Sequence, residues 1–156
     1  MMDWSVRPNQ LFAIALDYSP LNVKERKGVL DICTKELVTP KGIRSLSPKS
    51  GGYNPMYIGP QSQRDLAYHQ GTAWPWLTGF YLEAYLRVYK MSGVNYIERQ
   101  LIGFEEELFY HCVGTIPELF DGNPRFSGRG AISFAMNVSG ILRAIRLLEK
   151  YKIEEE

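Results

Sequence analysis

The sequence predicts an all-α protein with about five helices and long loops that carry the functional groups. Apolar residues recur at the spacing of amphipathic helices over most of the chain, and few or no segments have the pattern of strands. Gly, Pro, Ser and Tyr are concentrated in one long segment, residues 39–73. The length of 156 residues suggests one domain, residues 1–156, that is large enough to bury a core.

Two helices are predicted before residue 38. The run at residues 11–16 is apolar on all sides, which fits a short strand by pattern alone but suits a short helix buried on every side. Asn22 is a suitable N-cap for a second helix over residues 22–37. The apolar stripe of this second helix consists of Val29, Leu30, Cys33 and Leu37.

Residues 39–73 show no sustained periodicity. Long connections without structure of their own are uncommon in compact domains and are usually functional or disordered. Because this segment contains aromatic and charged residues rather than low-complexity sequence, we expect an ordered functional loop.

Two amphipathic helices follow and are separated at Ser92–Gly93. Pro75 suits the first turn of the first of them. Apolar residues repeat at helical spacing in both, which predicts one buried face for each. These residues are Leu77, Phe80, Tyr81, Ala84, Tyr85 and Val88 in the first helix, and Ile97, Leu101, Phe104, Leu108 and Cys112 in the second.

A last helix is predicted after the sequence Gly128-Arg129-Gly130. Its first half, Ala131 to Gly140, is nearly free of charge, so we expect this half to be deeply buried. Its apolar stripe consists of Phe134, Val138, Ile141, Leu142, Ile145 and Leu148.

Composition argues against several classes of function. The net charge of +1 gives no electrostatic reason to expect nucleic acid or an anionic membrane as partner. No stretch approaches the roughly 18 apolar residues of a membrane span, and the N-terminus does not have the pattern of a signal peptide. Cys33 and Cys112 both lie in apolar helical patterns, which favours reduced thiols and a cytoplasmic protein. No Cys/His spacing resembles a zinc site, so no metal is expected.

The segment Asp65–Trp76 is dense in groups that recognise polyhydroxylated ligands. Carboxylate, carboxamide and imidazole groups can bond to vicinal hydroxyls, and an indole can stack on a sugar face. The alternative is the start of a helix in which Trp74 and Trp76 anchor the core and His69 is structural. Taken together as a cluster, these residues favour a sugar site.

The loop Thr115–Gly122 carries two carboxylates, Glu118 and Asp121. Inverting glycoside hydrolysis needs two carboxyl groups on opposite faces of the scissile bond, about 6.5–9.5 Å apart. Two carboxylates three residues apart suit that arrangement poorly, so we expect one catalytic role, for Glu118. Asp121 is expected to orient the loop or to bind a hydroxyl group, although Asp121-Gly122 also fits a plain turn. Arg7 and Asn9 are expected to reach the same site or to cap the backbone.

Five sequence strings occur in the order seen in the C-terminal domain of glycogen debranching enzymes. The chain therefore resembles the amylo-α-1,6-glucosidase part of these enzymes, which is similar to glucoamylases. The strings that begin at Tyr68 and at Pro117 are, in combination, the part of this pattern that is most specific for the family. The strings are Arg7-Pro8-Asn9-Gln10, Gly42-Ile43-Arg44-Ser45-Leu46, Tyr68-His69-Gln70-Gly71-Thr72-Ala73-Trp74-Pro75-Trp76, Pro117-Glu118-Leu119-Phe120-Asp121-Gly122 and Gly128-Arg129-Gly130.

The resemblance implies an (α/α)6 toroid with a sugar pocket at one end. It implies hydrolysis of α-1,6-linked glucosyl branch stubs of glycogen or malto-oligosaccharides with inversion, without a metal or an organic cofactor. Glu118 matches the general base that activates water. The resemblance also implies a set of residues that line or support the pocket. They are Arg7, Asn9, Gln10, Asp65, Tyr68, His69, Gln70 and Trp74.

The chain departs from the family pattern in its number of helices. The toroid has twelve, and the general acid belongs to the part that precedes the Arg7 motif. We therefore expect the C-terminal portion of a divided or truncated enzyme, which pairs with a complementary N-terminal polypeptide or associates with itself. The alternative is a non-catalytic glucan-binding or regulatory relic.

Overall fold

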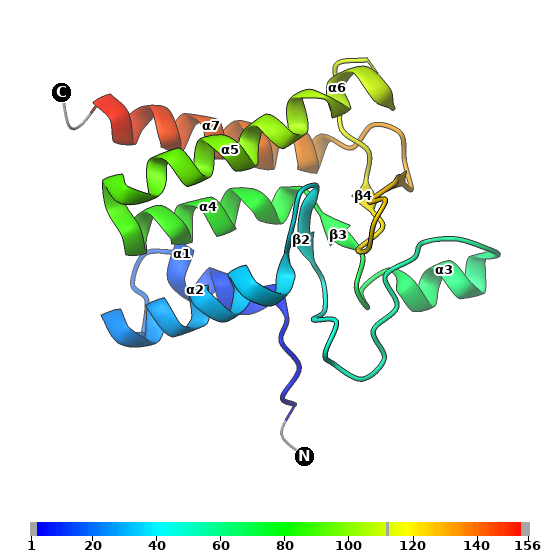
Figure 1. The fold of residues 1–156 in the computed structure, drawn as a ribbon, viewed down its shortest axis with the longest axis horizontal. Coiled ribbons are helices and arrows are strands. Elements are labelled where there is room, and N and C mark those ends of the chain that lie inside the picture. Colours follow the sequence, from blue (N-terminus) through cyan, green and yellow to red (C-terminus); the bar gives the residue numbers. More distant parts are fainter. Residues whose placement is uncertain (1–2, 112, 154–156) are drawn as a thin grey trace.

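The computed structural model describes residues 3–111 and 113–153, and most of them are helical. The central helix is α4 (Trp76–Tyr89), which packs on α7 (Ala135–Ile153) on one side and on the first helices of the chain on the other (Figure 1). Helix α5 (Val94–Glu105) lies against α7. The strands and most of the long loops lie at the end of this arrangement where α4 begins.

The first two helices form as predicted. A 3-10 turn, η1 (Pro8–Leu11), runs directly into the short helix α1 (Phe12–Ala15). Helix α2 (Val23–Leu37) begins after Asn22, whose side chain accepts a hydrogen bond from the Glu25 N–H at 3.0 Å. The Glu25 carboxylate accepts one from the Asn22 N–H at 2.8 Å, which completes a capping box.

The predicted boundary at Ser92–Gly93 is also confirmed. It lies in a 3-10 turn, η2 (Lys90–Gly93), that separates α4 from α5. After α5 the chain makes the short helix α6 (Glu107–Tyr110). Cys112, which the sequence places on the apolar stripe of this segment, lies outside the described residues.

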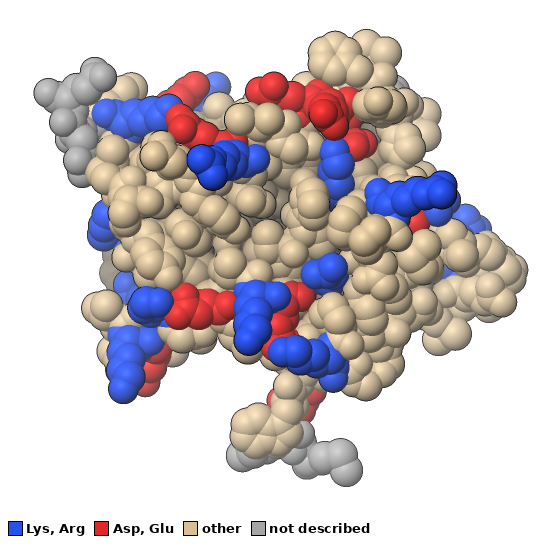
Figure 2. Space-filling model, in the orientation of Figure 1, with Lys and Arg blue, Asp and Glu red and all other residues tan. Residues whose placement is uncertain are grey.

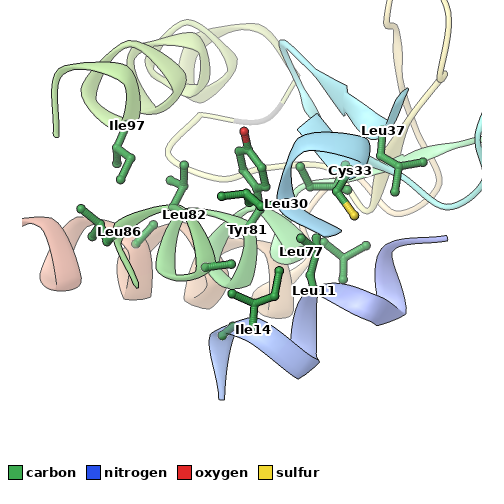
Figure 3. Packing of buried hydrophobic residues seen from close by; sticks show 14 of the residues in the cluster. Leu11, Ile14, Leu30, Cys33, Leu37, Leu77, Tyr81, Leu82, Leu86 and Ile97 are labelled. Carbon is green, nitrogen blue, oxygen red and sulfur yellow. The ribbon is translucent and has the colours of Figure 1, made fainter. Parts of the chain in front are cut away.

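The main core is formed where α4 meets α2 and α1. Tyr81, Leu82 and Leu86 of α4 and Leu30, Cys33 and Leu37 of α2 belong to it, and Figure 3 shows Tyr81 next to Leu30 while Leu82 and Leu86 lie toward Ile97 of α5. The Tyr81 hydroxyl is hydrogen-bonded to the Thr34 and Tyr96 hydroxyls at 3.0 and 2.9 Å, so this polar atom has partners inside the core. Burial raises the pKa of the Cys33 thiol to about 12, which keeps the thiol protonated.

Two glycines allow α4 and α7 to approach each other closely. A Cβ atom on Gly140 would lie 2.6 Å from the Trp76 Cα, and one on Gly79 would lie 2.5 Å from the Gly140 carbonyl oxygen. Any side chain at either position would push the helices apart. The backbone contact between these helices therefore depends on glycine at both positions.

The prediction of an all-α fold is wrong in one respect, because the chain also forms a small antiparallel sheet. Its strand order follows the sequence, from β1 to β5. Each strand has only two or three residues, too few to show an alternating pattern in the sequence. The strands are β1 (Val38–Thr39), β2 (Gly42–Arg44), β3 (Ala73–Trp74), β4 (Leu119–Phe120) and β5 (Gly128–Arg129).

The segment 39–73 is accordingly less irregular than predicted. It contains the β1–β2 hairpin and the helix α3 (Gln61–Ala67). The turn of the hairpin is closed by Thr39, whose hydroxyl donates to the Gly42 carbonyl at 2.8 Å and accepts from the Lys41 N–H at 3.2 Å. Gly42 has a φ of +134°, a conformation that favours glycine.

The expectation that Ala131 to Gly140 is deeply buried is also wrong. Ile132 is 68% exposed and Met136 is 46% exposed. Helix α7 begins only at Ala135, and α4 covers just one of its faces. The absence of charge in this segment therefore produces an apolar surface that the described residues leave uncovered.

Charges of both signs are interspersed over the face shown in Figure 2. No large patch of a single charge sign appears on this face, in keeping with a net charge of +1. None of the helices formed by the described residues combines the length and the apolar character needed to cross a membrane.

Candidate active site

The small sheet assembles the candidate site from distant parts of the sequence. Strand β3 pairs with β4, with Ala73 opposite Phe120, and β4 pairs with β5, with Leu119 opposite Arg129. Glu118 directly precedes β4. The pairing therefore brings Glu118 next to the aromatic residues before β3 and to the backbone that follows β5.

The Glu118 carboxylate is held at both oxygens. Oε1 accepts a hydrogen bond from the Tyr68 hydroxyl, and Oε2 accepts one from the Ala131 N–H at 2.9 Å. The Glu118 N–H donates to the Ala131 carbonyl, also at 2.9 Å. A Cβ on Gly130 would lie 2.3 Å from Oε2, so glycine leaves the room that the carboxylate needs. Each carboxylate oxygen keeps a lone pair for a further donor.

Tyr68 supports this arrangement from the side of α3. Its half-buried ring makes edge contacts with Trp74, at 4.8 Å between centroids, and with His69, at 4.7 Å. Burial, followed by the hydrogen bond to Glu118, raises the pKa of the Tyr68 hydroxyl. Tyr68 is therefore a neutral hydrogen-bond donor at physiological pH.

A cavity of about 370 Å³, which we call the aromatic pocket, opens beside Tyr68. Its walls combine apolar rings with a small number of polar groups, as in many small-molecule sites. None of the described residues that line it is an aspartate or a glutamate. The lining residues are Arg7, Pro8, Asn9, Ser45, Tyr68, His69, Trp74, Trp76, Leu77, Phe134 and Met136.

Arg7 is fixed at the wall of this pocket by the backbone and side chains around it. Its guanidinium donates to the His69 carbonyl at 2.8 Å and to the Gln70 side-chain oxygen at 3.0 Å. The Gln10 side chain donates to the Arg7 carbonyl at 2.9 Å. Gln10 and Gln70 thus support Arg7 but do not line the pocket themselves.

Trp74 is less open to a ligand than its position in the sequence implies. It is only 5% exposed, and its indole N–H donates to the Thr72 hydroxyl at 3.0 Å. The exposed His69 ring stacks on it at 5.7 Å with an interplanar angle of 16°. Trp74 is therefore both a pocket wall and a core residue, while the His69 ring lies nearer to solvent.

A second cavity, of about 530 Å³, is lined by Glu118, the hydrogen-bond partner of Tyr68. We call it the polar hollow, because its lining is mainly polar and includes three charged residues, Arg64, Glu118 and Arg129. Glu118 lines this hollow and not the aromatic pocket, whereas Tyr68 lines only the aromatic pocket. The residues of the hollow are Tyr57, Ile58, Gly59, Arg64, Glu118, Arg129, Gly130 and Ala131.

Asp121 is buried, with only 1% of its surface exposed, and its partners are two residues that line the polar hollow. Its Oδ1 accepts the Tyr57 N–H at 2.9 Å, and its Oδ2 accepts two hydrogen bonds from Arg129, at 2.9 and 2.8 Å. These contacts support a role in orienting the loop, and Asp121 is not among the described residues that line either cavity.

Asp65 does not join the site. It lies on α3 with its side chain exposed, and the Gln61 side-chain amide donates to its Oδ1 at 2.6 Å. Among the predicted site residues, the structure brings Arg7, Asn9, Tyr68, His69 and Trp74 together in the aromatic pocket.

Two residues that position the acidic loop were not selected from the sequence. Asn137 is fully buried, and its side-chain amide donates to the carbonyls of Pro117, at 2.5 Å, and Glu118, at 2.7 Å. The Arg44 Nε donates to the Gly122 carbonyl at 2.8 Å. Asn137 is the one strongly polar side chain in the uncharged stretch Ala131 to Gly140, and this contrast is the signal in the sequence for a structural amide.

Residues 3–111 and 113–153 contain no group of three His, Cys, Asp or Glu side chains that could hold a metal ion. The described site is thus built from hydrogen-bonding and aromatic groups.

A model of the amylo-alpha-1,6-glucosidase family matches residues 1–143. The chain belongs to this family. It is also 37% identical over 91 residues to the glycogen debranching enzyme of Saccharomyces cerevisiae. The aligned part covers 53% of this chain but only 6% of the yeast enzyme, so the chain corresponds to a small part of that relative. The resemblance to the C-terminal domain of debranching enzymes is therefore confirmed.

Proposed function

We propose that this chain is the C-terminal portion of an amylo-α-1,6-glucosidase domain that hydrolyses α-1,6-linked glucosyl stubs of glycogen-like glucans with inversion. In this proposal its helices form part of an (α/α)6 toroid in a cytoplasmic protein. The site residues themselves support it, since Glu118 lines the polar hollow and is hydrogen-bonded to Tyr68, which lines the aromatic pocket.

The observation that carries the proposal is the environment of the Glu118 carboxylate. The Tyr68 hydroxyl and the Ala131 N–H hold its two oxygens in place, yet it lines an open hollow. A fixed carboxylate with free lone pairs can accept the proton of a water molecule that attacks the anomeric carbon. Glu118 is the general base in this mechanism, and the aromatic pocket orients the glucosyl unit.

The general acid comes from a segment outside this sequence in our proposal. Of the described residues lining the two cavities, Glu118 is the one carboxylate, and an inverting hydrolase needs a second across the scissile bond. A general acid typically contributes about 10²–10⁴-fold to the rate. We therefore expect efficient hydrolysis only when a complementary polypeptide completes the site.

The uncovered face of α7 supports the same arrangement. Ile132, Met136 and Leu142 are exposed on or next to this helix, Leu142 by 53%. Contiguous exposed apolar surface marks interaction sites or leads to aggregation. We propose that a complementary N-terminal polypeptide, or a second copy of the chain, covers this face.

Reconstitution tests the proposal. The chain is mixed with the polypeptide that precedes the matching region in the yeast enzyme, and glucose release from an α-1,6-branched malto-oligosaccharide is measured. We expect turnover from the mixture and its loss in Glu118→Gln, with binding largely retained. Glu106→Gln, at an exposed position between α5 and α6, is the matched control. Unchanged turnover in Glu118→Gln would remove Glu118 from its assigned role.

The alternative function is that of a non-catalytic glucan-binding or regulatory relic. The absence of any carboxylate among the described lining residues of the aromatic pocket favours it. Calorimetric titration with malto-oligosaccharides separates the two. Heat of binding without turnover, even with the complementary polypeptide present, is the result that the relic predicts.

A further inference from the structure

We propose that an exposed tryptophan, Trp4, and the cavity beside it form a glucan platform, a binding site outside the aromatic pocket and the polar hollow. The platform holds neutral glucosyl units of a polysaccharide chain that also occupies the aromatic pocket. This inference rests on the proposed glucan function and adds to it a second point of contact for the polymer.

The cavity beside Trp4, which we call the outer cavity, encloses about 430 Å³. It is lined by residues 4–6, by Glu36 and Ser47, and by residues 49–51. None of these described residues lines the aromatic pocket or the polar hollow. Ligand sites in proteins usually measure about 300–1,000 Å³, so the outer cavity has room for a sugar unit.

Trp4 presents a flat apolar ring to solvent. It is 84% exposed, whereas tryptophan is usually one of the more buried residue types. Within the described part of the chain, its ring makes no contact with another aromatic ring. An indole can stack on the apolar face of a sugar, and such a contact removes the exposed ring from water.

The polar groups of the outer cavity select a neutral ligand. The Lys49 ammonium donates to the Glu36 carboxylate at 2.8 Å, so the two charges offset each other and attract neither anions nor cations. The Lys49 side chain is 68% exposed and keeps N–H groups for a further acceptor. The hydroxyls of Ser5 and Ser50 form no hydrogen bond within the described part of the chain, so they are open to a ligand. Ammonium and hydroxyl groups of this kind suit the hydroxyls of a sugar.

Two paired segments connect the outer cavity to the aromatic pocket. The Ser47 N–H donates to the Val6 carbonyl at 3.0 Å. Each segment lines both cavities, because Val6 is followed by Arg7 of the aromatic pocket, and Ser45 of that pocket lies two residues before Ser47. Three residues of extended chain span at most about 11 Å, which limits the distance from the Trp4 Cα to the Arg7 Cα. One malto-oligosaccharide of several units can therefore contact both cavities.

The length of the ligand tests the platform. Dissociation constants for maltohexaose and for glucose are measured by NMR titration of the whole chain and of Trp4→Ala. Loss of the stacking contact should weaken maltohexaose binding at least about fivefold, while glucose, which needs only the aromatic pocket, binds within about twofold of the original chain. Because Trp4 is exposed, its replacement should leave the fold intact.

Tyr110→Ala is the matched control. Tyr110 is also an exposed aromatic residue, at 81%, but it lines none of the three cavities. This variant should bind both ligands within about twofold of the original chain. Unchanged maltohexaose binding by Trp4→Ala would overturn the platform. If Trp4→Ala instead weakens only the association with the complementary polypeptide, Trp4 is a protein contact and the platform is wrong.

The ¹H–¹⁵N NMR signals of the unaltered chain locate the bound sugar independently of any variant. Maltohexaose should shift the Trp4 indole N–H and the Gly51 amide, together with the amide of His69 in the aromatic pocket. Shifts confined to His69 would overturn the platform and leave the proposed function standing. Shifts at Trp4 and Gly51 without any at His69 would support the platform and contradict the proposed role of the aromatic pocket. If none of the three signals moves, both proposals fail.

Discussion

The Asn137 side-chain amide donates to the Glu118 carbonyl oxygen at 2.7 Å, which links helix α7 directly to the backbone of the proposed base. The same amide donates to the Pro117 carbonyl, and its oxygen accepts the Trp76 N–H at 3.0 Å. One buried side chain therefore ties together the start of α4, the acidic loop and α7. Glu118 occupies its position because of this link as well as through its own side-chain contacts.

Asn137→Ala should lower the free energy of unfolding by about 2–3 kcal/mol, because it leaves buried backbone groups without partners. Urea denaturation followed by circular dichroism measures the change. Ser139→Ala on the same helix removes an exposed hydroxyl and should change stability by less than about 0.5 kcal/mol. Equal stabilities for the two variants would show that the Asn137 contacts do not hold the loop.

A pair of glycine substitutions tests the close approach of α4 and α7. Gly140→Ala should destabilise the protein by about 1–3 kcal/mol or more, because its Cβ would meet the Trp76 backbone at 2.6 Å. Gly28→Ala on α2 has open space around the new Cβ and should stabilise by about 0.5–1 kcal/mol. Thermal unfolding of both variants provides the comparison, and a neutral Gly140→Ala would contradict the described packing.

Glu36 should make stability depend on acid pH. The Lys49 ammonium, and then the Ser47 hydroxyl, hydrogen-bond to the buried Glu36 carboxylate and lower its pKa below its ordinary value of 4.5. The unfolded chain then binds the proton more tightly. The stability from Glu36 is thus fully present above about pH 4.5 and is lost as the pH falls through its lower, folded-state pKa.

The stability difference between the original chain and Glu36→Gln should therefore be largest at neutral pH and shrink between about pH 5 and pH 3. Urea titrations across this range measure it. Lys49→Met, which removes the larger cause of the shift, should move the acid transition to higher pH. A difference that stays constant with pH would rule out this linkage.

The Cys33 thiol should be inert in the folded protein. It is fully buried and its pKa is raised to about 12, so little thiolate forms at neutral pH. In a Cys112→Ser background, reaction with a thiol-specific chromogenic reagent should be at least about 100-fold slower in buffer than in denaturant. Equal rates would show that the elements packed against α2 do not cover this side chain.

The sequence predicted the helices well because their signals are local. Asn22 and the stripe that includes Leu30 determine α2 within one short segment, and the structure confirms both. The sheet was missed because its pairings are not local. Ala73 pairs with Phe120 across a long separation, and strands of two residues leave no periodic trace.

The candidate site could be predicted only in part, because only some of its contacts are local in the sequence. Residues within one motif, such as Tyr68 and His69, do lie together in the aromatic pocket. The motif did not show that Asp65 stays outside the two cavities, because Asp65 is an exposed residue of α3, whereas Tyr68 and His69 follow the end of this helix. The segment Ala131–Gly140 carries no charge. This property is shared by buried segments and by exposed apolar ones, so it could not predict that the segment is exposed.

The stereochemistry of glucose release tests the central proposal most directly. The first glucose formed from an α-1,6-branched malto-oligosaccharide by the reconstituted enzyme is followed by ¹H NMR before its anomers equilibrate. If Glu118 activates water for attack on the face opposite the leaving group, the first product is β-glucose, and Glu118→Gln forms none at a measurable rate. Initial formation of α-glucose, or β-glucose released at the full rate by Glu118→Gln, would contradict this account.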